Sequence, residues 1–187
     1  LMLEASEVAR LNSLFADVGR AGGRGTEAKR LWDTILARLS PLTNARASAL
    51  FLLSEDGEGF ELVGTRGIDA GELPAAPVDG RPLAAVNVAV SAEVARALEA
   101  WLESSELRKQ LRAAGHTHVA CVPIIAGSRL AGVGVLASNQ SFRGHYRDSD
   151  VLVLLGKQIG SIVENAQLIH TLERRETQAR ALYHISS

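Results

Sequence analysis

The chain of 187 residues has a single cysteine, Cys121, and almost no net charge. One cysteine excludes an internal disulfide framework and is typical of proteins of the reducing cytoplasm. The formal net charge of −1 leaves no basic field that would hold a nucleic-acid backbone or an anionic membrane. The sequence also lacks an apolar run of about 18 residues and a signal-peptide pattern. We therefore expect a cytoplasmic segment that contacts neither nucleic acid nor membrane.

The composition is that of a folded domain. Hydrophobic residues make up 47% of the chain and charged residues 22%, which is the balance of a globular protein rather than a disordered one. The length fits one domain with helices appended to it. Because the sequence opens on Leu1 instead of Met and stops at Ser187 within a helical pattern, we expect a fragment of a longer polypeptide.

Hydrophobic periodicity predicts an alternation of helices and strand pairs. Pro41 and Asn44 mark the end of the second helix, and a break near Ser104 and Ser105 interrupts the third. The predicted elements are helices over 1–18 and 27–40, a hairpin over 47–53 and 60–68, a helix over 91–115, a hairpin over 119–139 and a helix over 149–186.

Residues 69–90 have no clear pattern, because three prolines and many small residues interrupt them. The stretch 82–90 fits either an edge strand or a loop over a pocket. The sequence does not decide between these two structures.

A Gly-x-Gly motif occurs in the second hairpin, where Gly132-Val-Gly134 formally matches the dinucleotide-binding fingerprint. That fingerprint requires a helix directly after the glycines, and here a strand pattern and a polar loop follow. Two glycines at positions i and i+2 of a strand instead bare one face for the close approach of a helix or a ligand. We therefore interpret the motif as strand structure.

Cys121 lies near His116 and His118, a combination that occurs in nucleophilic and metal sites. Side chains alternate between the faces of a strand, so Cys121 and His118 are expected on opposite faces. Apolar neighbours raise the pKa of a thiol and reduce its reactivity. Asp148 and Asp150 precede the last helix and are interpreted as its cap and first-turn charges. We therefore assign no catalytic residue and no metal ligand.

The last helix has an apolar stripe that extends beyond the length needed to cover one domain. It continues without proline, and without glycine after residue 160, although Arg175 interrupts the stripe. A helix rises by about 1.5 Å per residue, so this one is expected to project and to pair with a second copy. The predicted interface of the homodimer consists of Val8, Leu11, Phe15, Leu168, Leu172, Ala179 and Leu182.

Two motifs carry a resemblance to a known family. The stretch VPIIAGSRLAGVGVLAS and the ending SFRGHYRDSDVLVLLGKQIGSIVENAQLIHTLE resemble conserved patterns of the GAF domain, a small-molecule sensory module. The resemblance implies an α/β (α+β) fold of the GAF/PAS type. Its central antiparallel sheet has five or six strands, with helices on one face, a pocket under loops on the other, and long N- and C-terminal helices. The expected parts are a signalling helix and linker (1–25), the GAF domain (26–170) and a coiled-coil linker helix (171–187) leading to an output domain.

The functional subfamilies of the GAF domain leave the ligand open. Bilin binders have a Cys-His pair and the methionine sulfoxide reductases several cysteines, neither of which this chain has. The cyclic-nucleotide binders have a characteristic series of residues, Asn-Lys, Phe and Asp-Glu. This chain matches it at Asn139, Phe142 and Asp148 but has Gln140 in place of the lysine. The sequence therefore leaves open whether a cyclic nucleotide is the ligand, and the cofactor is unknown.

The resulting hypothesis is a non-catalytic sensor segment of a bacterial-type signalling protein, such as a two-component system. It would bind an unknown small molecule and relay the signal through dimeric helices to a kinase, cyclase or transcription regulator. The alternatives are a ligand-free dimerisation scaffold and, third, an enzyme with the GAF fold. The predicted ligand-binding residues are Thr65, Arg66, Asn87, His116 and His118.

Overall fold

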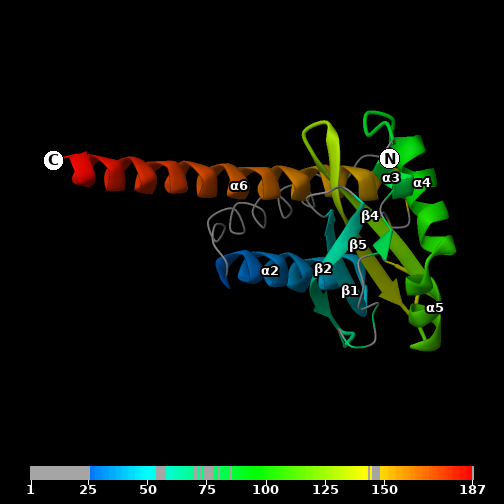
Figure 1. Ribbon diagram of the computed structural model, residues 1–187. Helices are drawn as coiled ribbons and strands as arrows, with labels where there is room; N and C mark the ends of the chain where they lie inside the picture. Colours follow the sequence, from blue (N-terminus) through cyan, green and yellow to red (C-terminus); the bar gives the residue numbers. More distant parts are fainter. Residues whose placement is uncertain are drawn as a thin grey trace.

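The computed structural model describes residues 26–53, 58–69, 71, 73, 78–79, 81–84, 86–142, 144 and 148–186. They form a five-stranded sheet of order β3-β2-β1-β5-β4 with helices packed on both faces (Figure 1). All strand pairs are antiparallel. The elements are, in chain order, α2 (Thr26–Thr43), β1 (Ala47–Leu53), β2 (Gly59–Arg66), β3 (Val78–Asp79), α3 (Arg81–Ala84), α4 (Ser91–Ser104), α5 (Glu106–Ala113), β4 (His118–Ala126), β5 (Arg129–Ser138) and α6 (Ser149–Ser186).

Both predicted hairpins are confirmed. Strand β1 pairs with β2, and β4 pairs with β5 along its whole length. Gly127 in the second turn has φ +63°, a conformation that glycine adopts without steric cost. The Gly-x-Gly motif lies inside β5, so the interpretation of these glycines as strand residues is correct. The predicted helix over 1–18 lies outside the described residues.

One face of the sheet is covered by α2 and α6. Their apolar side chains meet those of β1, β4 and β5 in a single buried cluster. This is the helix-covered face that the family resemblance implied. Members of this cluster are Ile35, Leu36, Leu39, Leu50, Val122, Ile124, Leu136, Leu152, Leu155 and Ile159.

The opposite face, where we expected a pocket under loops, is covered by α4 and α5. The two helices are separate because the backbone is extended at Ser105, as the sequence predicted. Trp101 anchors α4: its Nε1 donates a hydrogen bond to the carbonyl oxygen of Asp79 at 2.9 Å, and its ring packs edge-on against Phe60. This second apolar layer explains why both faces of β4 and β5 are apolar in sequence.

Helix α2 continues through Pro41, so the prediction that this proline ends the helix was wrong. A proline inside a helix costs its own N–H and crowds the carbonyl group four residues earlier. Here the helix continues for two more residues, and the side chain of Leu42 packs against the core. The helix ends at Thr43, directly before Asn44, the other residue predicted to end it, where φ reaches +64°.

The sequence left open whether residues 82–90 form an edge strand or a loop over a pocket. The segment as a whole is neither of these. The segment begins within the short helix α3 and continues into a turn, while the edge strand β3 lies earlier, at Val78–Asp79. In the turn, Oδ1 of Asn87 accepts a hydrogen bond from the N–H of Ala89 at 3.1 Å. This local bond is typical of asparagine before a helix, and α4 begins at Ser91.

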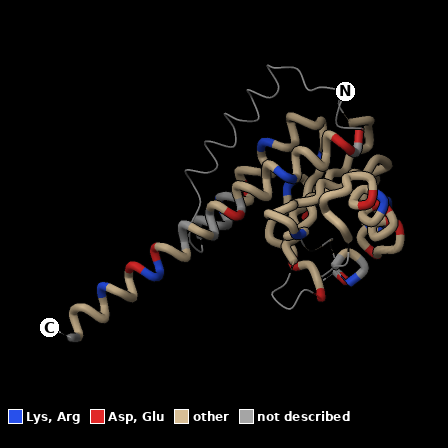
Figure 2. The backbone as a smooth tube through the Cα atoms, turned by 90° about the horizontal axis from the view of Figure 1, so that it is seen from above, with Lys and Arg blue, Asp and Glu red and all other residues tan. Residues whose placement is uncertain are grey.

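Helix α6 begins at a capped end and continues for 38 residues. Oδ1 of Asp148 accepts the N–H of Asp150 at 2.9 Å, as the sequence predicted. A helix of this length spans about 57 Å, and its C-terminal half extends away from the sheet (Figures 1 and 2). None of the helices in the described residues has the length and apolarity that crossing a membrane requires.

Two glycines seat α6 on the backbone of β4. A Cβ atom at Gly156 would overlap the carbonyl group of Pro123, and one at Gly160 would overlap that of Ile125. Any larger residue would therefore push the helix away from the strand. The glycines are one helical turn apart and lie on the same side of α6, so the helix contacts the strand directly along that side.

Candidate ligand-binding site

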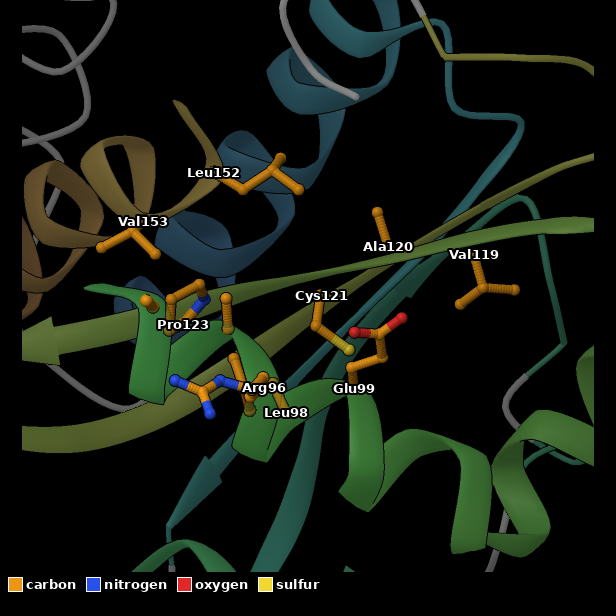
Figure 3. Close-up of a pocket in the computed structure, with 11 residues that line it drawn as sticks. Arg96, Leu98, Glu99, Val119, Ala120, Cys121, Pro123, Leu152 and Val153 are labelled. Atoms are coloured by element: carbon orange, nitrogen blue, oxygen red, sulfur yellow. The ribbon is translucent and has the colours of Figure 1, made fainter. Parts of the chain in front are cut away.

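A groove of about 390 Å³ lies between α4, the first half of β4 and the first turn of α6 (Figure 3). We call it the α4–β4 groove. Its walls are mostly small or apolar side chains, with two charged side chains on α4. The lining residues are Ala92, Ala95, Arg96, Leu98, Glu99, Val119, Ala120, Cys121, Pro123, Leu152 and Val153.

The groove exists because β4 is an edge strand that α6 covers only in part. The first four residues of β4 are exposed or partly exposed, and the last five, from Val122 onward, are buried. Burial begins where Gly156 and Gly160 bring α6 against the strand. On the exposed half, α4 is the nearest helix, and its groove-facing residues Ala92 and Ala95 are too small to fill the space.

Two charged side chains of α4 line the groove, Arg96 and Glu99, one helical turn apart. Both residues are exposed, and Figure 3 shows the Glu99 carboxylate beside the Cys121 thiol. The groove therefore offers a cation and an anion beside an apolar floor. Such a combination can bind an apolar ligand that also carries polar or charged groups.

Cys121 is not a reactive centre in this environment. Burial raises the pKa of its thiol from the ordinary value of 9.0 to about 12; the positive charge of Arg108 opposes this effect and the negative charge of Glu99 adds to it. The thiol is thus neutral at physiological pH, and the thiolate is the form that attacks electrophiles and binds metals. Its side chain packs with the cluster under α4 and α5, as the alternation of the strand predicted.

The predicted ligand-binding residues of β2 and β4 lie at opposite sides of the sheet. Three strand spacings separate β2 from β4 in the sheet order, which is about 14 Å. Thr65 pairs with Ala49 and is partly buried on the α4 side, whereas the adjacent Arg66 faces the other side and is exposed. These two residues and His118 therefore do not meet at one point.

The two histidines precede or begin β4. The N–H of His116 donates to the carbonyl oxygen of Leu111 at 3.0 Å, and its buried Nδ1 has no hydrogen-bond partner among the described residues. His118 is exposed, with Nδ1 3.0 Å from Oγ1 of Thr117. Neither histidine lines the α4–β4 groove, and Asn87 is an exposed turn residue before α4 that does not line it either.

Sequence reasoning selected none of the groove residues as ligand-binding candidates; it considered Cys121 only as a nucleophile or metal ligand and rejected both roles. A signal was present in the helix over 91–115, whose more exposed face combines alanines with Arg96 and Glu99. The sequence did not show that this face would lie beside an uncovered strand edge, because that depends on where α6 and α4 pack.

A second, much smaller cavity lies under α5, on the inner face of the sheet. Its volume of about 10 Å³ has room for roughly one water molecule. Side chains therefore fill the sheet face where the family resemblance predicted a pocket. Its lining residues are Ala47, Ser48, Ala49, Ile68, Leu73, Leu107, Leu111, Val135 and Ala137.

No metal site accompanies either cavity in the part of the chain that the structure describes, because no three His, Cys, Asp or Glu residues there are grouped closely enough to hold an ion.

The predicted dimer residues of α6 are exposed on the projecting half of the helix. Leu168 is 55% exposed, Leu172 63% and Leu182 67%. Ala179 lies on the same stripe and is exposed as well. Charged residues alternate in sign along this half of the helix (Figure 2). The predicted partners Val8, Leu11 and Phe15 lie outside the described residues.

Solved structures of sensory domains have the same fold. The GAF domain of an Acinetobacter phosphoenolpyruvate-protein phosphotransferase superimposes with a TM-score of 0.55 at 14% identity, covering 89% of this chain and 98% of that one. The GAF domain of a sensor histidine kinase from Pseudomonas syringae pv. tomato gives 0.53 at 16% identity, covering 92% and 97%. A domain of a two-component sensor histidine kinase protein from Sinorhizobium meliloti 1021 gives 0.54 at 17%, covering 78% and 96%.

At these identities the likeness establishes the fold alone. A search of curated proteins found no match. A family comparison identifies the GAF domain over residues 27–165, which includes every element from the second residue of α2 to the middle of α6. This chain therefore belongs to the GAF domain family, as its strand and helix motifs predicted.

Proposed function

We propose that this chain is the sensor segment of a larger signalling protein, in which a small ligand bound in the α4–β4 groove changes the position of α6. Membership of the GAF family and the structural likeness to domains of sensor histidine kinases support a sensory role. The segment itself is proposed to be non-catalytic. The output domain that receives the signal is proposed to be a kinase, a cyclase or a transcription regulator.

The observation that carries this proposal is the shared helix. Leu152 and Val153, in the first turn of α6, line the groove, and Leu168, Leu172 and Leu182 are exposed toward the other end of the same helix. A ligand in the groove would therefore touch the element that carries the apolar stripe.

The seating of α6 on β4 supports the transmission of a displacement. Gly156 and Gly160 hold the helix against the strand just beyond the groove, and about 45 Å of helix separates Leu152 from Leu182. α6 is proposed to have two positions relative to β4. A ligand that binds more tightly when the first turn is in one of them shifts the whole helix toward that position. The size of the shift is limited by the difference in affinity for the two arrangements.

We propose that the chain forms a homodimer through the exposed stripe of α6. A shift of α6 would then change how the two helices of the pair lie against each other. Leucines that are more than half exposed favour burial against another helix, and the three- and four-residue spacing is that of a coiled coil. Arg175 lies within this stripe, and the other charged residues between the leucines remain at the surface of such a pair. We also propose a cytoplasmic location, which the single cysteine supports.

Native mass spectrometry of the purified chain tests ligand binding. We expect a reproducible small-molecule mass, or one acquired from a metabolite extract. It should be lost when Ala95→Trp fills the groove. The matched control is Ala100→Trp, since Ala100 lies on the exposed side of the same helix. Equal retention of the mass by both variants would contradict the placement of the ligand in the groove.

A second candidate function is a dimerisation scaffold without a ligand. The observation that favours it is the inner cavity of about 10 Å³, which side chains fill. A chain that dimerises but never carries or acquires a bound mass would support the scaffold and exclude the sensor.

A further inference from the structure

The edge of β4 that faces the groove has free backbone groups, as two observations indicate. In an antiparallel strand the N–H and C=O of one residue point to the same side, and the side alternates along the strand. The carbonyl oxygen of Ala137 in β5 accepts a hydrogen bond from the N–H of Arg46 at 3.0 Å, so it points toward β1. Val119 is the β4 residue opposite Ala137, and its own backbone groups therefore point away from β5.

The second observation is the proline. Pro123 lies four residues after Val119, so its backbone has the same orientation. Proline has no N–H, and it fits at this position because no hydrogen bond to β5 is required there. Its carbonyl group contacts the Gly156 side of α6, on the outer edge of the strand. Cys121 lies between these two residues and must share their orientation. Val119 and Cys121 thus direct one N–H and one C=O each toward the groove.

These groups have no other partner in the described part of the chain. The backbone hydrogen bonds outside the β4–β5 ladder do not include Val119 or Cys121. Each residue as a whole is only partly buried and lines the groove, although the Cys121 thiol packs against the cluster under α4 and α5. Successive outward groups of a strand are about 6.8 Å apart, which is the repeat of an extended peptide.

The shape of the groove fits a short strand. α6 closes it at Pro123, while the end at His118 is exposed. From His118 to Val122 the strand spans about 13 Å, which is the length of roughly four extended residues. The small side chains of Ala92 and Ala95 line one side, and Leu152 contributes apolar surface at the closed end.

We propose that the ligand of the α4–β4 groove is a short extended peptide, which adds as a strand to the free edge of β4 through the backbone of Val119 and Cys121. This inference rests on the proposed function, since it names the ligand class of the same site. Main-chain hydrogen bonds supply the affinity in such strand addition, and the pockets for alternate side chains supply the selectivity. Here Arg96 and Glu99 would select the charge of the peptide, and small apolar side chains would face the alanines.

NMR titration of the ¹⁵N-labelled chain with the blocked tetrapeptide acetyl-Ala-Val-Lys-Ala-amide tests this proposal. We expect the amide proton signals of Val119 and Cys121 to move downfield and to saturate at millimolar peptide. Cys121→Pro removes one outward N–H and leaves the bonds to β5 intact, as Pro123 does two residues later. It should weaken binding about three- to tenfold relative to Cys121→Ala, which also lacks the thiol but keeps the N–H; this difference is the loss of one net hydrogen bond.

A change in the peptide provides a second test in case the Cys121→Pro protein does not fold. The same tetrapeptide with N-methylated amides cannot donate main-chain hydrogen bonds, and we expect it not to bind. The proposal is overturned by unmoved Val119 and Cys121 signals at millimolar peptide, by equal binding of the methylated peptide, or by a dimer of the free chain that Cys121→Pro dissociates. The last result would assign the edge to a second copy.

Failure of the two proposals is distinguishable. A bound non-peptide mass that Ala95→Trp removes would leave the sensor function standing and overturn the peptide. Peptide binding that changes neither the dimer fraction nor the signals of α6 would support the peptide and exclude the proposed relay.

Discussion

Replacement of Gly156 by alanine tests the seating of α6 on β4. In an exposed helix this change would stabilise the protein by about 1 kcal/mol, because alanine is the better helix former. At Gly156 the added Cβ overlaps the carbonyl group of Pro123 and approaches the backbone N of the same residue. Backbone cannot rotate away as a side chain can, so the helix must move outward.

Outward movement separates Leu152, Leu155 and Ile159 from the cluster in which they are buried. Overpacking of a core costs about 1–3 kcal/mol, and partial loss of the contacts of one buried leucine costs a similar amount. After the gain in helix propensity, we expect Gly156→Ala to lower the free energy of unfolding by about 2–4 kcal/mol. For a domain of this size the melting temperature should fall by about 5–15 °C.

Urea and thermal unfolding followed by circular dichroism measure this change. The matched control is Lys157→Ala, on the exposed side of the same turn, for which we expect a change within about 0.5 kcal/mol. If Gly156→Ala proved as stable as the wild type or more stable, the close contact between α6 and β4 would be refuted, and with it the proposed transmission.

Two further changes test the dimer and the environment of the thiol. Leu172→Lys, at a residue 63% exposed, should convert dimer into monomer in light scattering, whereas Thr177→Lys on the other side of α6 should not. An unchanged mass for Leu172→Lys would exclude this stripe as the interface. Because burial raises the pKa of Cys121 to about 12, the folded thiol should react with a disulfide reagent at pH 8 at least about a hundredfold more slowly than the unfolded one. The stability that the neutral thiol contributes is complete below pH 9.0 and is lost as the pH rises toward 12. Between these pH values the free energy of unfolding should therefore fall more for the wild type than for Cys121→Ala. If it falls equally for both proteins, the thiol is exposed.

Much of the secondary structure could be predicted from the sequence because each element has a strong local pattern. The hairpin β4–β5 is an example: apolar runs flank a turn with glycine, and alternation placed Cys121 and His118 on opposite faces. Pro41 was misjudged because local rules weigh the missing N–H and not the packing of Leu42 against the core. Residues 82–90 stayed ambiguous since small residues and prolines carry no periodicity.

The candidate site could not be predicted to the same extent. Thr65, Arg66, Asn87, His116 and His118 were selected as polar residues near strand ends. The order of the strands, which determines that β2 and β4 are far apart, depends on contacts between residues distant in sequence. Whether these five residues bind a ligand stays a prediction.

The sequence by itself determined the family and the elements, because periodicity, turn residues and two motifs are local properties of the chain. Tertiary structure alone decided which edge of the sheet is free. That edge arises where α6, held by Gly156 and Gly160, covers the end of β4 and leaves Val119 and Cys121 open. The physical reason is that a strand's unpaired N–H and C=O groups are the same in every sequence, and only the packing of distant helices determines which of them face a groove.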